Sequence, residues 1–178
     1  FKSIQPKRKI GNLIINSEKK IKDQAEVFHY IRDLINTPAN VLGPTEIYMS
    51  AKKYLKKDFN CNVFSDNKLK KEFPLISEVG NGASSNKKPM LCEFYTLKKK
   101  RKTNKKIFII GKGVSFDTGG LNLKTGAGMS LMKKDMGGAA NTIGLAKLLS
   151  TYEVDVEIHL LLCLVENSVS ERAMRPSD

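Results

Sequence analysis

The chain has 178 residues, a mass of 19.9 kDa and 40% hydrophobic residues, enough for one domain with a hydrophobic core. No apolar stretch approaches the roughly 18 to 20 residues of a membrane-spanning helix, and the basic N-terminus lacks the apolar segment of a secretory signal. The three cysteines are scattered and odd in number, which argues against a disulfide framework and favours a reducing, cytoplasmic location.

The formal net charge of +13 is concentrated in the first 106 residues, which hold 24 of the 31 lysines and arginines. A dense basic run spans residues 98–106, but only five basic side chains in the whole chain are arginines. Nucleic-acid surfaces usually combine arginine with aromatic platforms. We therefore interpret the run as a solvated loop between strands, with nucleic-acid binding as the weaker alternative.

Three helices are predicted in the first part of the chain. Apolar residues at spacings of three and four predict a helix over residues 18–35, capped by Ser17 and ended by Asn36 and Pro38. A second amphipathic helix is expected over residues 45–57, with Thr45 as its cap, and a short helix over residues 68–73.

Strands alternate with these helices and continue to the end of the chain. Strands are expected at residues 62–65, 90–96, 107–110 and 156–165, with a further helix over residues 136–149. Residues 107–110 are all apolar, which predicts a strand buried on both faces. The alternation predicts an α/β fold, a three-layer sandwich with a central mixed sheet covered by helices on both faces.

A glycine-rich segment, residues 111–138, follows one predicted strand and precedes a helix. Ligands of α/β proteins bind at the carboxyl ends of strands, where this segment lies. Its eight glycines indicate unusual backbone dihedrals or close approach of the backbone to other groups. The segment matches neither a P-loop nor a dinucleotide-binding fingerprint.

Four polar residues of this segment are the candidates for chemistry: Lys112, Asp117, Lys124 and Asp135. Two carboxylates on separate loops suit a divalent metal ion. A metal would favour loss of the proton from a nearby lysine, which could then be a ligand. A second lysine that stays charged could polarise a carbonyl group. The alternative is that both lysines are solvated and that the aspartates cap turns and the following helix.

Several stretches resemble the leucine aminopeptidase (cytosol aminopeptidase) family, whose members are dinuclear metallo-exopeptidases. The similarity rests on Gly-Lys-Gly-Val-Ser-Phe-Asp-Thr-Gly-Gly at 111–120, Leu-Lys at 123–124 and Met-Lys-Lys-Asp-Met-Gly-Gly-Ala-Ala at 132–140. Arg-Asp-Leu-Ile-Asn-Thr-Pro-Ala-Asn at 32–40, Val-Glu-Asn at 165–167 and Arg-Pro-Ser-Asp at 175–178 look like flanking segments of the same family.

The resemblance implies a role for each candidate residue. Lys112 would bind metal through a neutral amine, Asp117 would bridge two metal ions, and Asp135 would bind the same ion as Lys112. Lys124 would be the catalytic lysine, binding the substrate by polarising the scissile carbonyl group. Met132 would line the pocket for the first side chain of the substrate, with simple core packing as an equal alternative.

The resemblance also implies the activity and its requirements. It implies hydrolysis of the first bond of peptides with a free N-terminus, with leucine-type residues preferred. The expected cofactors are two divalent ions per subunit, Mn or Zn, and bicarbonate in a full-length protein, which would be a homo-hexamer. A DNA-binding or structural role of an inactive family member is the alternative.

The same resemblance divides the chain into parts. Residues 1–16 would be the tail of an N-terminal domain or a linker, residues 17–36 an interdomain helix, and residues 37–178 the first part of a truncated catalytic domain. The family's next motif, Asn-Thr-Asp-Ala-Glu-Gly-Arg, is not found. We expect neither Glu166 nor Asp178 to replace it, so the chain alone should lack turnover. We also expect an unpaired edge on the apolar strand at 158–165.

Overall fold

The computed structural model describes residues 19–97, 102–152 and 154–178. The expected cap Ser17, the tail at 1–16 and part of the basic run therefore lie outside the described residues. No helix within the described ranges combines the length and the apolar character needed to cross a membrane.

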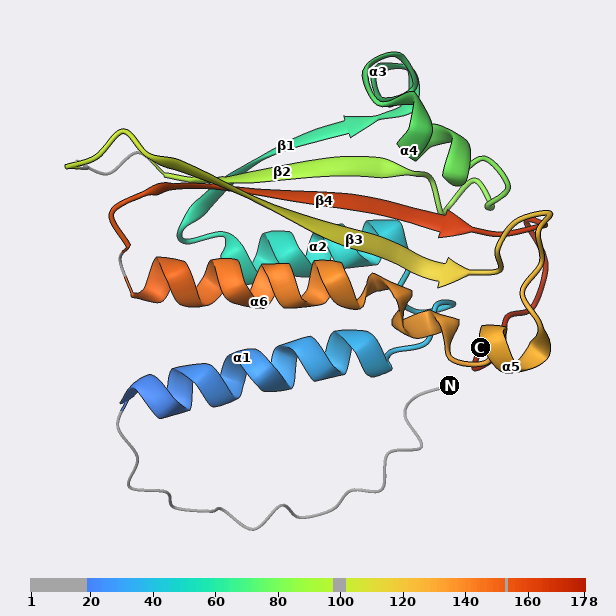
Figure 1. Ribbon diagram of the computed structural model, residues 1–178, viewed down its shortest axis with the longest axis horizontal. Coiled ribbons are helices and arrows are strands. Elements are labelled where there is room, and N and C mark those ends of the chain that lie inside the picture. The colour runs from blue at the N-terminus through green and yellow to red at the C-terminus, as the bar shows by residue number, and fades with distance from the viewer. Residues whose placement is uncertain (1–18, 98–101, 153) are drawn as a thin grey trace, which may run out of the picture.

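Four strands form one mixed sheet (Figure 1). They are β1 (Phe59–Ser65), β2 (Met90–Thr96), β3 (Lys106–Asp117) and β4 (Glu157–Asn167), in the spatial order β1-β2-β4-β3. The pairs β1–β2 and β2–β4 are antiparallel, whereas β3 and β4 are parallel. The predicted α/β class with a central mixed sheet is confirmed.

Three long helices lie on one side of the sheet. α2 (Pro44–Leu55) and α6 (Gly137–Thr151) pack side by side against the sheet, and α1 (Lys19–Asn36) packs on α6 (Figure 1). The short helices α3 (Asp66–Glu72) and α4 (Pro74–Val79) lie on the other side, where α4 contacts β2 and β4. Two further short helices, α5 (Gly126–Met129) and the 3-10 helix η1 (Met132–Met136), interrupt the glycine-rich segment.

The hydrophobic core lies between the sheet and α2 and α6. Alternate residues of β4 point into it and are almost completely buried, as the two-residue period of a strand requires. The core-facing residues of β4 are Ile158, Leu160, Leu162 and Leu164. α6 contributes small side chains, among them Ala139 and Ala140, which allow its axis to lie close to the sheet.

Two expectations about the sheet are wrong within the described residues. β3 is an edge strand, so Phe108 and Ile110 are 59% and 66% exposed instead of buried on both faces. β4 is central and pairs with both β2 and β3, so the strand at 158–165 has no unpaired edge. The reason is the crossover through α6, which returns the chain to the start of the sheet. β4 then lies between β2 and β3, two strands that come earlier in the chain.

Two helix starts differ from the predictions because of proline. α2 begins at Pro44 and has Gly43 as its cap, whose N–H donates to the Glu46 carboxylate at 2.9 Å, so Thr45 is not the cap. Pro74 ends α3 and begins the unpredicted α4, consistent with the preference of proline for the first helical turn.

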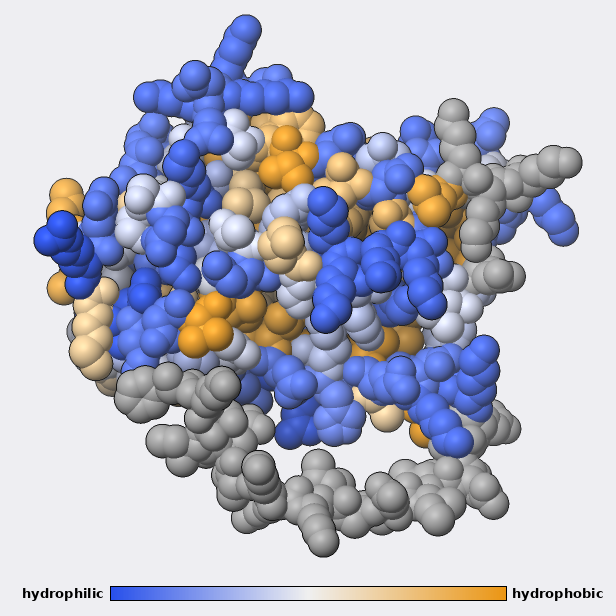
Figure 2. Space-filling view, turned by 180° about the vertical axis from the view of Figure 1, so that it is seen from behind, coloured by the Kyte–Doolittle hydropathy of each residue, from blue (hydrophilic) through white to orange (hydrophobic). Residues whose placement is uncertain are grey.

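The surface is mostly hydrophilic, with separate hydrophobic patches on the side opposite the view of Figure 1 (Figure 2). On the sheet face away from α6, α4 and the ends of β3 and β4 enclose an apolar depression of about 260 Å³. Its lining residues include Leu75, Val79, Val114 and Val165, with Lys112 at its border. Helices therefore cover this face at one end only.

Two glycines of β3 allow the strand to pack closely, Gly111 against α6 and Gly113 against β4 and α6. A Cβ on Gly111 would lie 2.8 Å from the Cα of Ala139, and a Cβ on Gly113 would lie 2.8 Å from the carbonyl oxygen of Cys163. Both contacts are with backbone atoms, which cannot move aside as a flexible side chain can. The Gly-Lys-Gly pattern is thus required for packing on both sides of Lys112.

Gly113→Ala should lower the free energy of unfolding by about 1–3 kcal/mol, the usual cost of overpacking a core. Gly126→Ala is the matched control, because a Cβ there meets nothing within 4 Å. Urea unfolding of both variants measures the difference. Equal transition midpoints for the two variants would contradict the packing role of Gly113.

Candidate functional site

The glycine-rich segment turns back on itself directly after β3. Gly119 and Gly120 have φ angles of +89° and +68°, which side chains with a Cβ rarely adopt. The N–H of Lys124 donates to the carbonyl oxygen of Thr118 at 2.9 Å and closes the turn. This local fold returns the Lys124 side chain to Asp117, the last residue of β3.

Asp117 accepts hydrogen bonds from three directions. Its Oδ1 accepts from the Gly119 N–H at 3.0 Å and from Asn167 Nδ2 at 2.7 Å, and its Oδ2 lies 3.2 Å from Lys124 Nζ. Burial alone would raise the pKa of Asp117. The hydrogen bonds from Gly119, Lys124 and Asn167 outweigh it and hold that pKa below its ordinary value. Asp117 is therefore a carboxylate at neutral pH.

Lys112 and Asp135 form a second pair. Lys112 Nζ lies 2.8 Å from both carboxylate oxygens of Asp135 and donates a hydrogen bond to Oδ1. The other oxygen, Oδ2, is buried and accepts no hydrogen bond. Asp135 in η1 is held against β3 by the start of α6, where Gly138 packs on the backbone of Lys112. A Cβ on Gly138 would lie 3.1 Å from the N and O atoms of Lys112.

The four polar residues singled out in the sequence thus form two Lys–Asp pairs, one at Asp117, the last residue of β3, and one at Lys112, five residues earlier in the same strand. Met132 begins η1, in the same segment as Asp135, and is partly buried. The structure places the two histidines elsewhere. His29 lies on α1, and His159 on β4 lies 2.9 Å from Glu93 and 2.7 Å from Glu157.

The donors of this segment fit a cation only in part. Asp135 Oδ2 is buried, and among the described residues its partner is the Lys112 ammonium at 2.8 Å, an ion pair without a donated hydrogen bond. Each of the two carboxylates, Asp117 and Asp135, has a positive charge beside it in the form of a lysine ammonium, and a metal cation could bind to the same carboxylate oxygens. However, no group of three or more His, Cys, Asp or Glu side chains in the described parts of the chain is arranged so that it could hold a metal ion. A two-ion site needs carboxylates beyond Asp117 and Asp135.

Glu166 and Asp178 are both engaged by Arg175. Arg175 Nη1 lies 2.6 Å from Glu166 Oε1, and its Nε lies 2.9 Å from Asp178 Oδ2. The Glu166 side chain is 2% exposed, so the pair is buried, and the N–H of Asn40 donates to Asp178 at 3.2 Å. These contacts fasten the segment after β4 to the loop before α2.

Asn167 is a site residue that sequence reasoning missed, and the structure places it in contact with Asp117. In the sequence this asparagine stood out only as part of the Val-Glu-Asn stretch at 165–167. The available signal was its position, two residues beyond the predicted apolar strand 156–165 and therefore at the same end of the sheet as the carboxyl end of a parallel neighbour.

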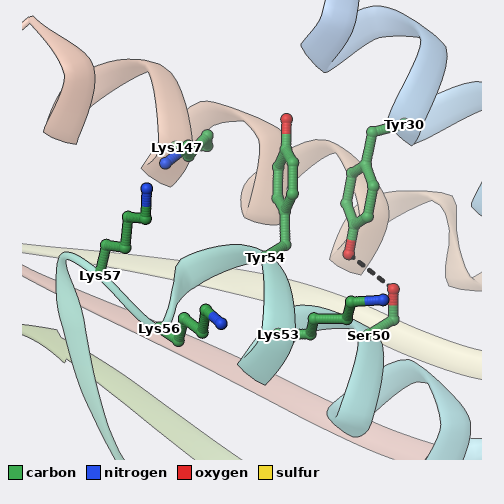
Figure 3. Close-up of a pocket in the computed structure, with 7 residues that line it drawn as sticks. All are labelled: Tyr30, Ser50, Lys53, Tyr54, Lys56, Lys57 and Lys147. Carbon is green, nitrogen blue, oxygen red and sulfur yellow. Dashed lines mark hydrogen bonds between the residues drawn. The ribbon is translucent and has the colours of Figure 1, made fainter.

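A second cavity, of about 480 Å³, lies between α1, α2 and α6 (Figure 3). The Tyr30 and Tyr54 rings stack on each other at 3.8 Å, and burial raises the pKa of Tyr30 to about 12 although its hydroxyl is hydrogen-bonded to Ser50. Lys147 pairs with Asp58 at 3.2 Å. The remaining lysines that line the cavity are Lys53, Lys56 and Lys57. Because the two tyrosines stack on each other, neither offers both ring faces to a nucleic-acid base.

The fold and the site together define an α/β protein with paired lysines and aspartates at a strand end. The profile of the cytosol aminopeptidase family, catalytic domain, matches residues 29–178. The chain belongs to this family.

Known proteins are similar to this chain over most of its length. The neutral chloroplastic leucine aminopeptidase of Solanum lycopersicum is 40% identical over 171 residues, covering 90% of this chain and 30% of that protein. The crystal structure of cytosol aminopeptidase from Coxiella burnetii has a TM-score of 0.79 at 39% identity and covers 89% of this chain and 34% of that one. The bottromycin maturation enzyme BotP in complex with Mn has a TM-score of 0.75 at 28% identity, with 89% and 34% covered. The chain therefore spans about a third of the length of these relatives.

Arg175→Ala should lower the free energy of unfolding by about 3–5 kcal/mol, because it leaves the buried Glu166 carboxylate without its cation. Arg172→Ala is the control, since that side chain is exposed and belongs to the same segment. Chemical denaturation of both variants measures the effect. A loss below about 1 kcal/mol for Arg175→Ala would show that the pair is not a structural anchor.

Proposed function

We propose that the protein of this chain is a metal-dependent aminopeptidase that hydrolyses the N-terminal peptide bond of peptides, with leucine-type residues preferred. The observation that carries the proposal is the pairing of Lys112 with Asp135 and of Lys124 with Asp117 at the carboxyl end of β3, in a chain of this family. Peptides with a free N-terminus are the proposed substrates.

Lys112, Asp117 and Asp135 are the residues proposed to hold metal. Two divalent ions, Mn or Zn, would supply an activated water and an electrophile for the scissile carbonyl group. The complex of the similar enzyme BotP with Mn supports a divalent ion. Since the described residues offer two carboxylates and one lysine amine here, the second ion depends on further carboxylates. Bicarbonate is proposed as an additional cofactor.

Lys124 is proposed to stabilise the oxyanion that develops during hydrolysis. Its side chain is 33% exposed, and Asp117 fixes its position at 3.2 Å, so the ammonium is both oriented and accessible. A positioned cation that meets charge developing in the transition state lowers the activation barrier more than it favours substrate binding. Met132 is proposed to line the pocket for the first side chain.

The exposed apolar surface of α1 bears on domain organisation and assembly. We propose that α1 is an interdomain helix, because Ile21 and Phe28 are 53% and 60% exposed on its surface and would be covered by a neighbouring domain. Residues 1–16 would be a tail or linker, and a homo-hexamer is the proposed assembly. A cytoplasmic location is favoured by three free cysteines, although a relative's name includes the chloroplast.

The alternative of DNA binding has less support. The relatives described above are aminopeptidases or a maturation enzyme by name, and none of these names refers to nucleic acid. No arginine is found among the described residues that line the second cavity, and Lys147 is already paired with Asp58.

Lys124→Ala should lower kcat by at least about 100-fold, the usual scale for loss of one donor to an oxyanion, with little change in KM or metal content. The test uses the full-length protein that contains this chain, a leucine amide substrate and added Mn. Lys88→Ala is the matched control, because Lys88 also pairs with an aspartate at 2.9 Å, but with Asp66, which follows β1 at the opposite edge of the sheet from β3. A variant that kept kcat but lost metal would make Lys124 a ligand instead.

Asp117→Ala should weaken Mn binding at both proposed sites, because a bridging carboxylate contacts both ions. Calorimetric titration of the same protein with Mn measures stoichiometry and affinity. Asp66→Ala removes a surface carboxylate of similar pairing and should change neither. Unchanged two-site binding in Asp117→Ala would exclude the bridging role.

A further inference from the structure

Asn167 is the last residue of β4 and lies beside the proposed metal ligand Asp117. Its Nδ2 donates to Asp117 Oδ1 at 2.7 Å, the shortest hydrogen bond that Asp117 accepts among the described residues. A role of Asn167 in metal binding rests on the proposed function, because it concerns how Asp117 would meet a metal ion.

A β-bulge brings the two side chains together. Val114 pairs with Val165, but Asp117 pairs with Asn167, so β3 contains one residue more than β4 over this stretch. Without the extra residue, Phe116 would lie opposite Asn167. Bulges re-aim side chains near functional sites, and this one turns Asp117 toward the amide of Asn167.

The backbone of Asn167 is also held by the segment that follows β3. Its carbonyl oxygen accepts two hydrogen bonds from Thr118, one from the N–H at 3.0 Å and one from the hydroxyl at 2.8 Å. The preceding residue, Glu166, is buried and paired with Arg175. The amide of Asn167 therefore has a fixed position relative to the end of β3.

The two oxygens of Asp117 have different surroundings as a result. Oδ1 accepts from Gly119 N–H and Asn167 Nδ2, which uses both of its lone pairs. Among the residues that the structure describes, the partner of Oδ2 is the Lys124 ammonium at 3.2 Å. A carboxylate free to rotate could present either oxygen to a cation, but this one is held with Oδ2 outward.

We propose that Asn167 is a positioning residue, which together with the Gly119 N–H holds Oδ1 of Asp117, so that Oδ2 is the oxygen that would bridge the two metal ions. Partners of this kind, hydrogen-bonded to a metal ligand, typically contribute about 10- to 100-fold in metal affinity. The amide acts through Asp117 and contacts no substrate.

The test measures Mn affinity and the visible absorption of bound Co²⁺ in the full-length protein that contains this chain. Asn167→Leu keeps the branched shape and removes the donor, and Asn167→Ala is a second variant in case leucine prevents folding. Asn62→Leu is the matched control, since Asn62 Nδ2 also donates to a carboxylate, Glu93 at 3.1 Å, but from β1 on the opposite edge of the sheet.

Both Asn167 variants should bind Mn about 10- to 100-fold more weakly and should shift the Co²⁺ bands at saturating metal, whereas Asn62→Leu should match the wild type. A purely structural role would lower stability without moving the Co²⁺ bands. If Asp117→Ala loses metal but the Asn167 variants behave like Asn62→Leu, the inference about Asn167 is overturned and the proposed function stands. If the wild type binds no Mn, or Asp117→Ala binds it normally, the proposed function fails and the inference fails with it.

Discussion

The parallel pairing of β3 with β4 is the constraint on which the site depends. Ten pairs of residues align the two strands from Lys106–Glu157 to Asp117–Asn167. The final pair follows the bulge, so the register at the strand end determines which residue of β3 meets Asn167. Ser115 and Thr118 strengthen that end, because their hydroxyls donate to the carbonyl oxygens of Val165 and Asn167 at 3.3 and 2.8 Å. The direction of the Asp117 carboxylate is thus a consequence of sheet register.

Close packing of α6 on β3 provides the second part of the geometry. Gly111 and Gly113 leave room for Ala139, and Gly138 leaves room for the backbone of Lys112. A helix that lay farther from the sheet would carry η1 and Asp135 away from Lys112. Small residues on both elements therefore do more than fill the core, because they fix the distance between two side chains that come from different elements.

The sequence was most informative where chemistry and local structure coincide. The glycine-rich segment and its four charged residues were predictable, since strained turns require glycine and each charge near a strand end needs a partner. The burial of Phe108 was wrongly predicted, because local hydrophobicity does not reveal whether a strand is central or at an edge. The central place of β4 and the contact of Asn167 with Asp117 depend on pairing between segments 50 residues apart, which no periodicity within either segment encodes.

Charge balance explains how such a site can fold without an ion. Two carboxylates brought together without cations would repel each other and lose hydration, which costs several kcal/mol when they are partly buried. Here each carboxylate meets a lysine of the same segment, with Lys112 at Asp135 and Lys124 at Asp117, so residues 111–138 neutralise their own acidic pair. The two lysines differ in exposure, at 61% for the Lys112 side chain and 33% for Lys124. The Lys112 side chain can therefore change partners more freely, whereas Lys124 is held beside Asp117 by the turn that closes directly after β3.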